Sequence, residues 1–260
     1  LVGSEMCIRD RYCTFALQIY IEKNMTVGVI SAMDSEHRQL VERLQKKEES
    51  AYGNLHYVDG MLGSNRVILT QCGIGKVNAA VGATELIRRF TPDCVVSTGV
   101  AGGIDTCLDV ADVVVSERLV YHDVWCGEDY EYGQMAEMPA VYEGCAFLLK
   151  HALSLNSVEQ GSRIHSGLIC TGDQFITNRV GLDAIKRRFP DGIAVDMEST
   201  AIAQVCYLYN TPFLSFSIIS DTPGIEDHSA QYTGFWETMA ERSFLTTWAF
   251  LSTLPDKLQL

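Results

Sequence analysis

Residues 194–201 read AVDMESTA and join an apolar run to a helical pattern. The apolar residues 192–195 predict a short buried strand. The segment that follows places Ile202, Val205 and Cys206 on one stripe of a helix. Asp196 and Glu198 therefore stand where a strand passes into a helix, which is a typical ligand position in a layered α/β sheet.

Two further carboxylates occupy similar positions. Glu36 follows the apolar run 27–32, and Asp221 follows the apolar run 213–219. Each has a plainer explanation in isolation, because carboxylates are common at helix starts and in turns. Ligands in α/β sheets bind outside the carboxyl ends of the strands, however. We therefore expect the three acidic strand ends to converge on one crevice.

Strands and helices alternate along the rest of the chain. We expect strands at 26–32, 55–58, 67–71, 94–98, 113–120, 164–171, 193–195 and 213–219. We expect helices at 35–47 and 76–90, between the later strands, and after Tyr232. In the helix 76–90, Val77 and Val81 are expected to face inward with Ala80, Leu86 and Ile87. The alternation favours helices on both faces of a sheet. The expected fold class is α/β, a single-domain three-layer sandwich around a central mixed, mostly parallel sheet.

The first 24 residues are expected to lie outside this domain. Residues 3–11, GSEMCIRDR, look like translated sequencing-adapter or upstream DNA, and a strong strand pattern begins directly after Met25. We therefore expect residues 1–24 to be an extraneous or disordered tail, and residues 25–260 to form the functional domain. The sequence contains no apolar run long enough to span a membrane.

Composition argues against several classes of function. The formal net charge is −13 at pH 7, whereas a nucleic-acid surface needs clustered Lys and Arg. The nine cysteines are scattered without a CxxC motif, which suits a reducing cytosol. The six histidines form no HExxH or Cys/His cluster, so we expect no metal site. We expect a cytoplasmic protein without a nucleic-acid or membrane partner.

Two glycine turns and one aromatic segment are further candidates for ligand contacts. The turns at 73–76 and 99–103 let a backbone approach a ligand closely, although neither has the spacing of a common phosphate loop. Phe175 and Ile176 can stack on a flat base, although residues of this kind more often fill a core. Asp196 and Glu198, which bracket Met197, can bind two adjacent hydroxyls.

In combination these segments resemble the 5′-methylthioadenosine/S-adenosylhomocysteine nucleosidases of the nucleoside phosphorylase superfamily. The resemblance extends almost without gaps from Met25 to Asp221. The blocks that carry it are 28–33 (GVISAM) with Glu36, 72–77 (CGIGKV), 98–103 (TGVAGG), 121–123 (YHD), 130–134 (YEYGQ), 171–176 (TGDQFI), 194–201 and 219–221 (ISD).

The resemblance implies a role for each matching residue. Glu36 is the general base that activates water against the anomeric carbon. Asp221, helped by Ser220, is the acid that protonates N7 of the departing adenine. The substrate-binding positions are Phe175 and Ile176 at the base, Ala101 and Gly102 on the base side, and Met197 and Glu198 around the ribose. Asp196, beside them, stays a candidate for binding a sugar hydroxyl.

These roles fit the chemistry of an N-glycosidic bond. Its cleavage produces an oxocarbenium-like sugar and an anionic base, so an acid and a base are needed on opposite faces. A free aspartic acid has a pKa of about 3.9. An aspartic acid that donates a proton at neutral pH therefore needs burial or a neighbouring charge that raises its pKa.

Some positions depart from the family pattern. The family usually has a small hydroxyl residue at Val100, a glutamate at Asp196 and an arginine at Ser217. The first and last of these help to hold the attacking water. Tyr232 is the best substitute for the aromatic residue that caps the adenine. The loop 121–139 reaches the neighbouring subunit's pocket in this family, which implies a homodimer.

The resulting prediction is a cofactor-free purine nucleosidase that hydrolyses methylthioadenosine or adenosylhomocysteine to adenine and the thio-sugar. Water is favoured over phosphate, because Asp34 and Glu36 after the first strand would repel a dianion. Three alternatives stay open. They are a sibling hydrolase for another adenine nucleoside such as aminofutalosine, a phosphorolytic transferase, and a catalytically weak nucleoside-binding protein.

Overall fold

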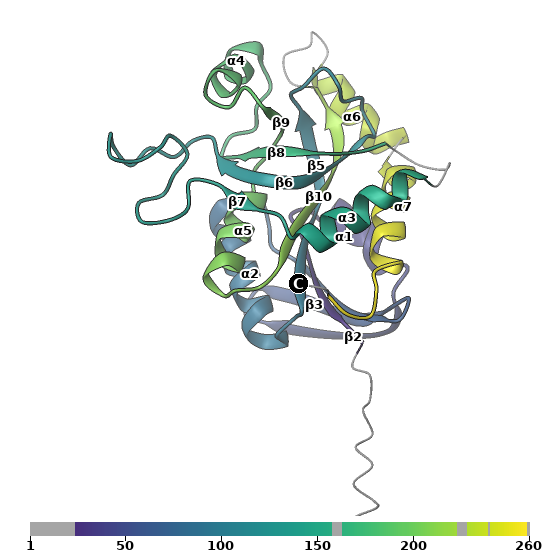
Figure 1. Ribbon diagram of the computed structural model, residues 1–260. Coiled ribbons are helices and arrows are strands. Elements are labelled where there is room, and N and C mark those ends of the chain that lie inside the picture. The colour runs from purple at the N-terminus through teal and green to yellow at the C-terminus, as the bar shows by residue number, and fades with distance from the viewer. Residues whose placement is uncertain (1–23, 158–162, 223–227, 239, 259–260) are drawn as a thin grey trace, which may run out of the picture.

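The computed structural model describes residues 24–157, 163–222, 228–238 and 240–258. The predicted tail of residues 1–24 lies outside this part of the chain, apart from Asn24. A ten-stranded mixed sheet forms the centre of the molecule (Figure 1). Its strands are β1 (Thr26–Ser31), β2 (Gln45–Tyr52), β3 (Leu55–Leu62), β4 (Asn65–Gln71), β5 (Cys94–Gly103), β6 (Val113–Tyr121), β7 (Tyr142–Glu143), β8 (Ile164–Thr171), β9 (Gly192–Asp196) and β10 (Phe213–Asp221). The helices are α1 (Asp34–Val41), α2 (Lys76–Phe90), α3 (Ala146–Ser154), α4 (Arg179–Arg188), α5 (Ser199–Leu208), α6 (His228–Thr238) and α7 (Ala240–Ser252).

Strand β5 pairs with three other strands, β1, β9 and β10. β1 lies parallel to the first half of β5, with Val27 opposite Cys94. β10 runs parallel to β5 from Val95 to Gly102. β9 pairs antiparallel with the last residues of β5, where Val195 lies opposite Gly102. The carboxyl ends of β1, β5, β9 and β10 therefore meet in one region.

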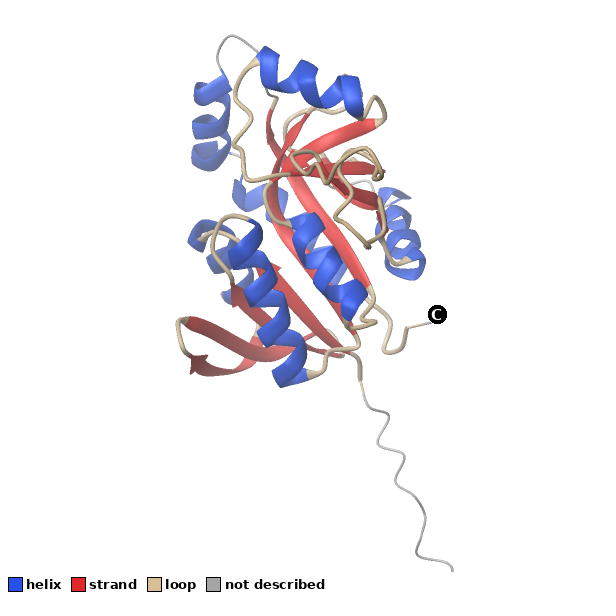
Figure 2. Ribbon diagram, turned by 90° about the vertical axis from the view of Figure 1, so that its left-hand side faces the viewer, coloured by secondary structure: helices blue, strands red, loops and turns tan. Residues whose placement is uncertain are grey.

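Alternate residues of the central strands pack on opposite faces of the sheet. On β1, Val27 and Val29 join a core cluster with residues of α1, α3, α6 and α7. Ile30 faces the other way and joins a cluster with residues of α2 and α5. Figure 1 shows α2 and α5 on one side of the central strands and α1, α3 and α7 on the other, and Figure 2 looks onto the α2 and α5 side. The predicted α/β class with helices on both faces is confirmed.

The helix expected at 35–47 is shorter than predicted. α1 ends at Val41, and residues 45–52 form strand β2 instead. All eight residues of β2 are exposed, and the strand pairs antiparallel with β3. A strand without a buried face lacks the alternation of apolar residues by which strands are recognised in a sequence. Pairing with β3, a tertiary effect, decides its conformation.

The helix 76–90 is confirmed as α2, but part of its predicted inward face is wrong. Val77 is 75% exposed and Val81 is 51% exposed. The buried face instead contains Ala79, Gly82, Ala83, Leu86 and Ile87. Small residues let the helix approach the sheet closely: a Cβ on Gly82 would lie 2.6 Å from the Cβ of Cys72. The close approach of α2 to the sheet therefore decides which side of the helix is buried, and the hydrophobicity of its side chains has less influence.

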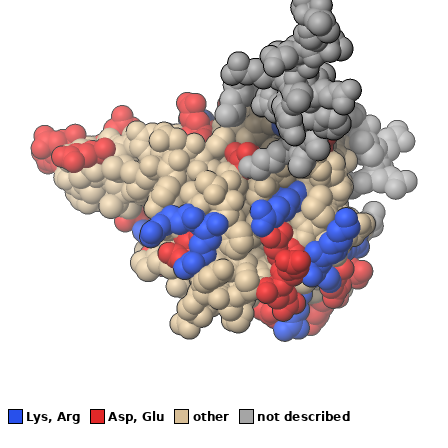
Figure 3. Space-filling model, turned by 90° about the horizontal axis from the view of Figure 1, so that it is seen from below, with Lys and Arg blue, Asp and Glu red and all other residues tan. Residues whose placement is uncertain are grey.

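Basic side chains lie among acidic ones on the face shown in Figure 3. Arg38 pairs with Asp34, and Arg89 pairs with Glu85, each across one helical turn. Exposed pairs of this kind contribute at most about 1 kcal/mol. Among the described residues, no helix is both long and apolar enough to cross a membrane.

Candidate active site

A pocket of about 370 Å³ lies where the ends of β1, β5, β9 and β10 meet. All ten predicted site residues line it, namely Glu36, Ala101, Gly102, Phe175, Ile176, Asp196, Met197, Glu198, Ser220 and Asp221. The other lining residues are Ala32, Met33, Ile74, Val100, Gln174, Val195 and Tyr232. The three acidic strand ends therefore converge on one crevice, although 185 positions separate Glu36 from Asp221 (221 − 36).

Glu36 is fixed by three backbone N–H groups. Its Oε2 accepts from Ala32 and Met33, each at 2.9 Å, and its Oε1 accepts from Val100 at 3.0 Å. The side chain is buried, and burial raises its pKa to about 7 against the opposing effect of these hydrogen bonds. A Cβ on Gly99 would lie 2.5 Å from Oε1. Glycine at this position therefore leaves room for a carboxylate that accepts a proton near neutral pH.

Asp221 ends β10 and is 2% exposed. Its Oδ1 accepts a hydrogen bond from Ser220 Oγ at 2.5 Å, and its Oδ2 lies 2.6 Å from His228 Nε2. Burial raises the pKa of Asp221, and the contacts with Ser220 and His228 act in the opposite direction. A buried carboxyl with a raised pKa is suited to donate a proton.

The carboxylates Glu198 and Asp196, which follow the predicted strand 192–195, are held by different groups. Glu198 Oε1 accepts from the Gly75 backbone N–H at 2.7 Å. Asp196 Oδ1 accepts from Thr171 Oγ1 at 2.6 Å, which ties β9 to β8. Burial and the neighbouring charge of Asp196 raise the pKa of Glu198 to about 8. Both carboxylates thus keep oxygens at the pocket where two hydroxyls of a sugar can donate.

Aromatic rings form another wall of the pocket. Phe175 is 56% exposed, and its ring centroid lies 5.6 Å from that of Tyr232 in an edge-on arrangement. An exposed ring at the mouth of a pocket offers a face for a flat ligand. Tyr232 lines the same pocket. This position fits the predicted substitute for an aromatic cap.

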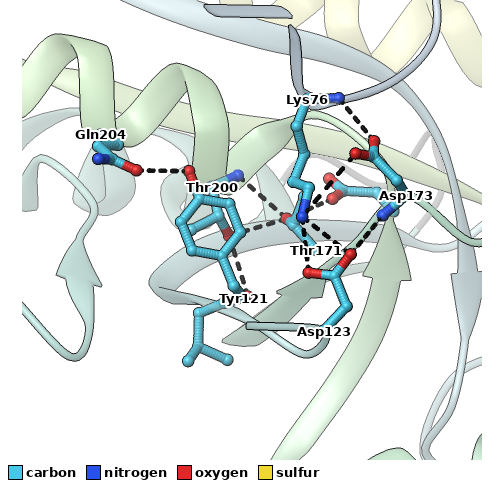
Figure 4. A network of polar contacts seen from close by, with 9 residues as sticks. Lys76, Tyr121, Asp123, Thr171, Asp173, Thr200 and Gln204 are labelled. Atoms are coloured by element: carbon cyan, nitrogen blue, oxygen red, sulfur yellow. Dashed lines mark hydrogen bonds and ion pairs between the residues drawn. The ribbon is translucent and has the colours of Figure 1, made fainter. Parts of the chain in front are cut away.

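A charged network supports the turn that carries Gly75. Figure 4 shows Lys76, Asp123 and Asp173 pointing toward one another. Lys76 Nζ lies 2.8 Å from Asp123 Oδ1, and the Lys76 backbone N–H donates to Asp173 Oδ1 at 2.8 Å. The Asp173 backbone N–H donates to Asp123 Oδ2 at 2.8 Å. The network joins the Gly75 turn to the loop that leads into Phe175, so it fixes two walls of the pocket together.

Sequence reasoning missed several groups at this site. The Gly75 N–H donates to Glu198. This donor was not predictable, because nearly every residue type has a backbone N–H. Ile74 and Gln174 also line the pocket. They lie inside the matching blocks, but no role at the site was predicted for them. His228 contacts Asp221 but lies beyond Asp221, where the close resemblance to the family ends and no motif marks it.

A small chamber of about 20 Å³ lies behind the carboxylates. Its polar lining includes Glu36, Asp196, Glu198, Thr98 and Ser217. The hydroxyl of Thr98 is buried and has no hydrogen-bond partner among the described residues. A polar space of this size can hold one water molecule.

Replacing Lys76 with Met tests the charged network. The change leaves Asp123 without its cation, so the free energy of unfolding should fall by about 1.5–3 kcal/mol, the range for hydrogen bonds to charged groups. Urea unfolding measures this loss. Arg38→Met is the matched control, because it breaks the exposed pair with Asp34, and should cost less than about 1 kcal/mol. Equal losses in the two variants would contradict the structural importance of the network.

Comparisons with known proteins agree with this geometry. The phosphorylase superfamily model matches residues 26–252. The chain is 40% identical to a 5′-methylthioadenosine/S-adenosylhomocysteine nucleosidase of Oceanobacillus iheyensis over 221 residues, which cover 84% of this chain and 95% of that protein.

Two solved structures share the fold. The nucleosidase of Colwellia psychrerythraea, in complex with adenine, superposes with a TM-score of 0.85 at 36% identity, covering 90% of this chain and 98% of that one. The nucleosidase of Neisseria meningitidis, in complex with methylthio-immucillin-A, gives a TM-score of 0.84 at 35% identity, covering 88% and 100%. The chain belongs to the 5′-methylthioadenosine/S-adenosylhomocysteine nucleosidase family, within the phosphorylase superfamily.

Proposed function

We propose that this protein hydrolyses the N-glycosidic bond of 5′-methylthioadenosine and S-adenosylhomocysteine, releasing adenine and the thio-ribose. The observation that carries the proposal is the presence of Glu36 and Asp221, both buried and both with raised pKa values, in one pocket. Two carboxyl groups in such surroundings can divide the roles of base and acid. The names of the similar proteins support the choice of substrate.

In the proposed mechanism, Glu36 takes a proton from water as the water oxygen bonds to the anomeric carbon. Asp221 gives its proton to N7 of adenine, and the electron pair of the glycosidic bond passes to the base. Phe175 stacks on the adenine, with Ile176, Ala101 and Gly102 beside it. Met197, Glu198 and Asp196 hold the ribose, and Ser220 orients Asp221. A carboxylate near the positive sugar also stabilises it electrostatically.

The charge of the pocket supports water over phosphate as nucleophile. The described lining includes Glu36, Asp196, Glu198 and Asp221 but no lysine or arginine. Lys76, at the nearby glycine turn, already pairs with Asp123. A phosphate dianion needs arginines or free backbone N–H groups. A neutral water molecule meets no such electrostatic penalty.

Product analysis in the absence of phosphate tests this proposal. Methylthioadenosine incubated with the protein in phosphate-free buffer should yield adenine and free methylthioribose, because water supplies the oxygen. Chromatography resolves both products, and added phosphate should neither accelerate the reaction nor yield a sugar 1-phosphate. A strict requirement for phosphate would favour the transferase alternative. Binding without any turnover would favour the nucleoside-binding alternative.

The pH dependence of kcat/KM tests the role of Glu36. A general base acts in its ionised form, and burial raises the pKa of Glu36 to about 7. The rate should therefore fall as the pH drops below about 7, approaching tenfold per pH unit. Burial also raises the pKa of Glu198, to about 8, so the pH profile alone does not show which residue is the base. The Glu36→Gln variant decides this: it should lower kcat by about 10²–10⁴-fold and abolish the fall in rate at low pH. A Glu36→Gln variant that keeps this fall in rate would remove Glu36 from the role, and the exposed Glu42→Gln serves as control.

We also propose that the protein is a cytoplasmic homodimer. An apolar surface, which we call the α2–α5 face, contains exposed residues of these two packed helices and the turn before α2: Ile74, Val77, Val81, Tyr207 and Leu208. The segment 122–141 projects from the body of the molecule (Figure 1) and carries the exposed Trp125. Apolar surface of this kind usually marks an interface. The seven described cysteines are free thiols, which suits a reducing compartment.

Light scattering tests the assembly. The wild type should elute as a dimer at micromolar concentration, and Val77→Glu should shift it to monomer, because a charge would be buried without a partner. Val180→Glu is the matched control, since Val180 is equally exposed but lies on α4. A monomeric wild type, or dissociation by both variants alike, would contradict an interface at the α2–α5 face.

A further inference from the structure

His228 and Asp221 form a buried pair behind the pocket. The imidazole Nε2 lies 2.6 Å from Asp221 Oδ2, and the two side chains are 5% and 2% exposed. His228 does not line the pocket, although its ring centroid lies 5.7 Å from that of Phe175. Its Nδ1 is buried without a hydrogen-bond partner among the described residues. Among the described residues, Asp221 is therefore the hydrogen-bond partner of the His228 ring.

The charge on Asp221 explains what this contact does. Once Asp221 has given up its proton, a carboxylate remains in a site with little access to water. A buried carboxylate costs several kcal/mol unless hydrogen bonds compensate it. Among the described residues, two side chains contact this carboxyl group, Ser220 at Oδ1 and His228 at Oδ2. The negative charge shared by the two oxygens is therefore stabilised by Ser220 at Oδ1 and by His228 at Oδ2.

We propose that His228 is the positioning residue of the general acid: its Nε2–H holds the Asp221 carboxyl group in one orientation and stabilises the carboxylate that forms as adenine is protonated. This inference rests on the proposed function. As the glycosidic bond breaks, its electron pair passes to adenine, the Asp221 proton moves to N7, and the O–H electron pair stays on the carboxylate. His228 keeps its own proton throughout. Glu36 takes a proton from the attacking water, so the enzyme loses one proton and gains one. Proton exchange with solvent after the products leave returns Glu36 to the carboxylate and Asp221 to the acid.

Kinetics of adenine release by His228 variants test this inference. His228→Phe keeps a ring beside Phe175 but removes both nitrogens, and should lower kcat about 10²-fold, at the lower end of the range for acid catalysis. KM should change by less than about threefold, because His228 does not touch the substrate in the proposed mechanism. His228→Gln restores an N–H donor near the position of Nε2 and should recover kcat to within about tenfold of wild type.

A double variant separates positioning from a general structural role. In the Asp221→Asn background the acid is already lost, so adding His228→Phe should lower kcat by no more than about threefold further. His165→Phe is the matched control, because His165 Nε2 makes a comparable 3.2 Å contact with Asp112 outside the pocket. It should leave kcat unchanged in both backgrounds.

Each other outcome contradicts the inference. Unchanged kcat in His228→Phe, equal losses with and without Asp221, or a Gln variant no better than Phe would overturn it. A loss of adenine binding in His228→Phe, measured by calorimetry, would assign His228 to the fold of the pocket instead. A wild-type protein that releases no adenine would refute the proposed function itself, which is a separate result.

Discussion

The carboxyl end of β5 is the constraint on which the whole pocket depends. Its backbone meets every element that carries an acid. Gly99 has no side chain where Glu36 Oε1 lies, and the Val100 N–H then binds that oxygen. One residue further along, Ala101 pairs with Ile219 of β10, and Gly102 pairs with Val195 of β9. A single extended segment thus sets the distances between Glu36, Asp221 and Asp196, because hydrogen-bonded strands hold fixed spacings.

The convergence of these strand ends places several carboxyl groups close together in a buried site. Hydrogen bonds, rather than neighbouring cations, compensate these groups. Glu36 has three backbone donors, Glu198 has the Gly75 N–H, and Asp221 has Ser220 and His228. These donors lower each pKa but do not outweigh burial, so the pKa values of these groups stay raised. Proton transfer needs groups whose two protonation states are close in free energy at the working pH. Burial with partial compensation brings Glu36 into that range.

The sequence was sufficient to predict the α/β class, the range of α2 and ten of the residues that line the pocket, because apolar runs and matching blocks mark them. It failed where tertiary contacts decide. Strand β2 has no buried face and exists through pairing with β3. The buried side of α2 is determined by the close contact of Gly82 with Cys72. His228 contacts Asp221 but lies beyond the part of the sequence that closely resembles the family, so residue type and spacing carried no signal for that contact.

The departures from the family pattern at Val100 and Ser217 have different consequences for Glu36. At position 100 the backbone N–H holds Glu36, and a valine side chain leaves that bond intact. At position 217, where the family usually has an arginine, Ser217 belongs to a buried row of serine hydroxyls. Ser217 Oγ lies 3.1 Å from Ser215 Oγ, which in turn lies 2.7 Å from Ser199 Oγ. This row borders the polar chamber behind Glu36. Neutral hydroxyls do not lower the pKa of a nearby carboxylate as an arginine would. The absence of that charge is therefore consistent with a Glu36 carboxyl group whose pKa burial raises to about 7.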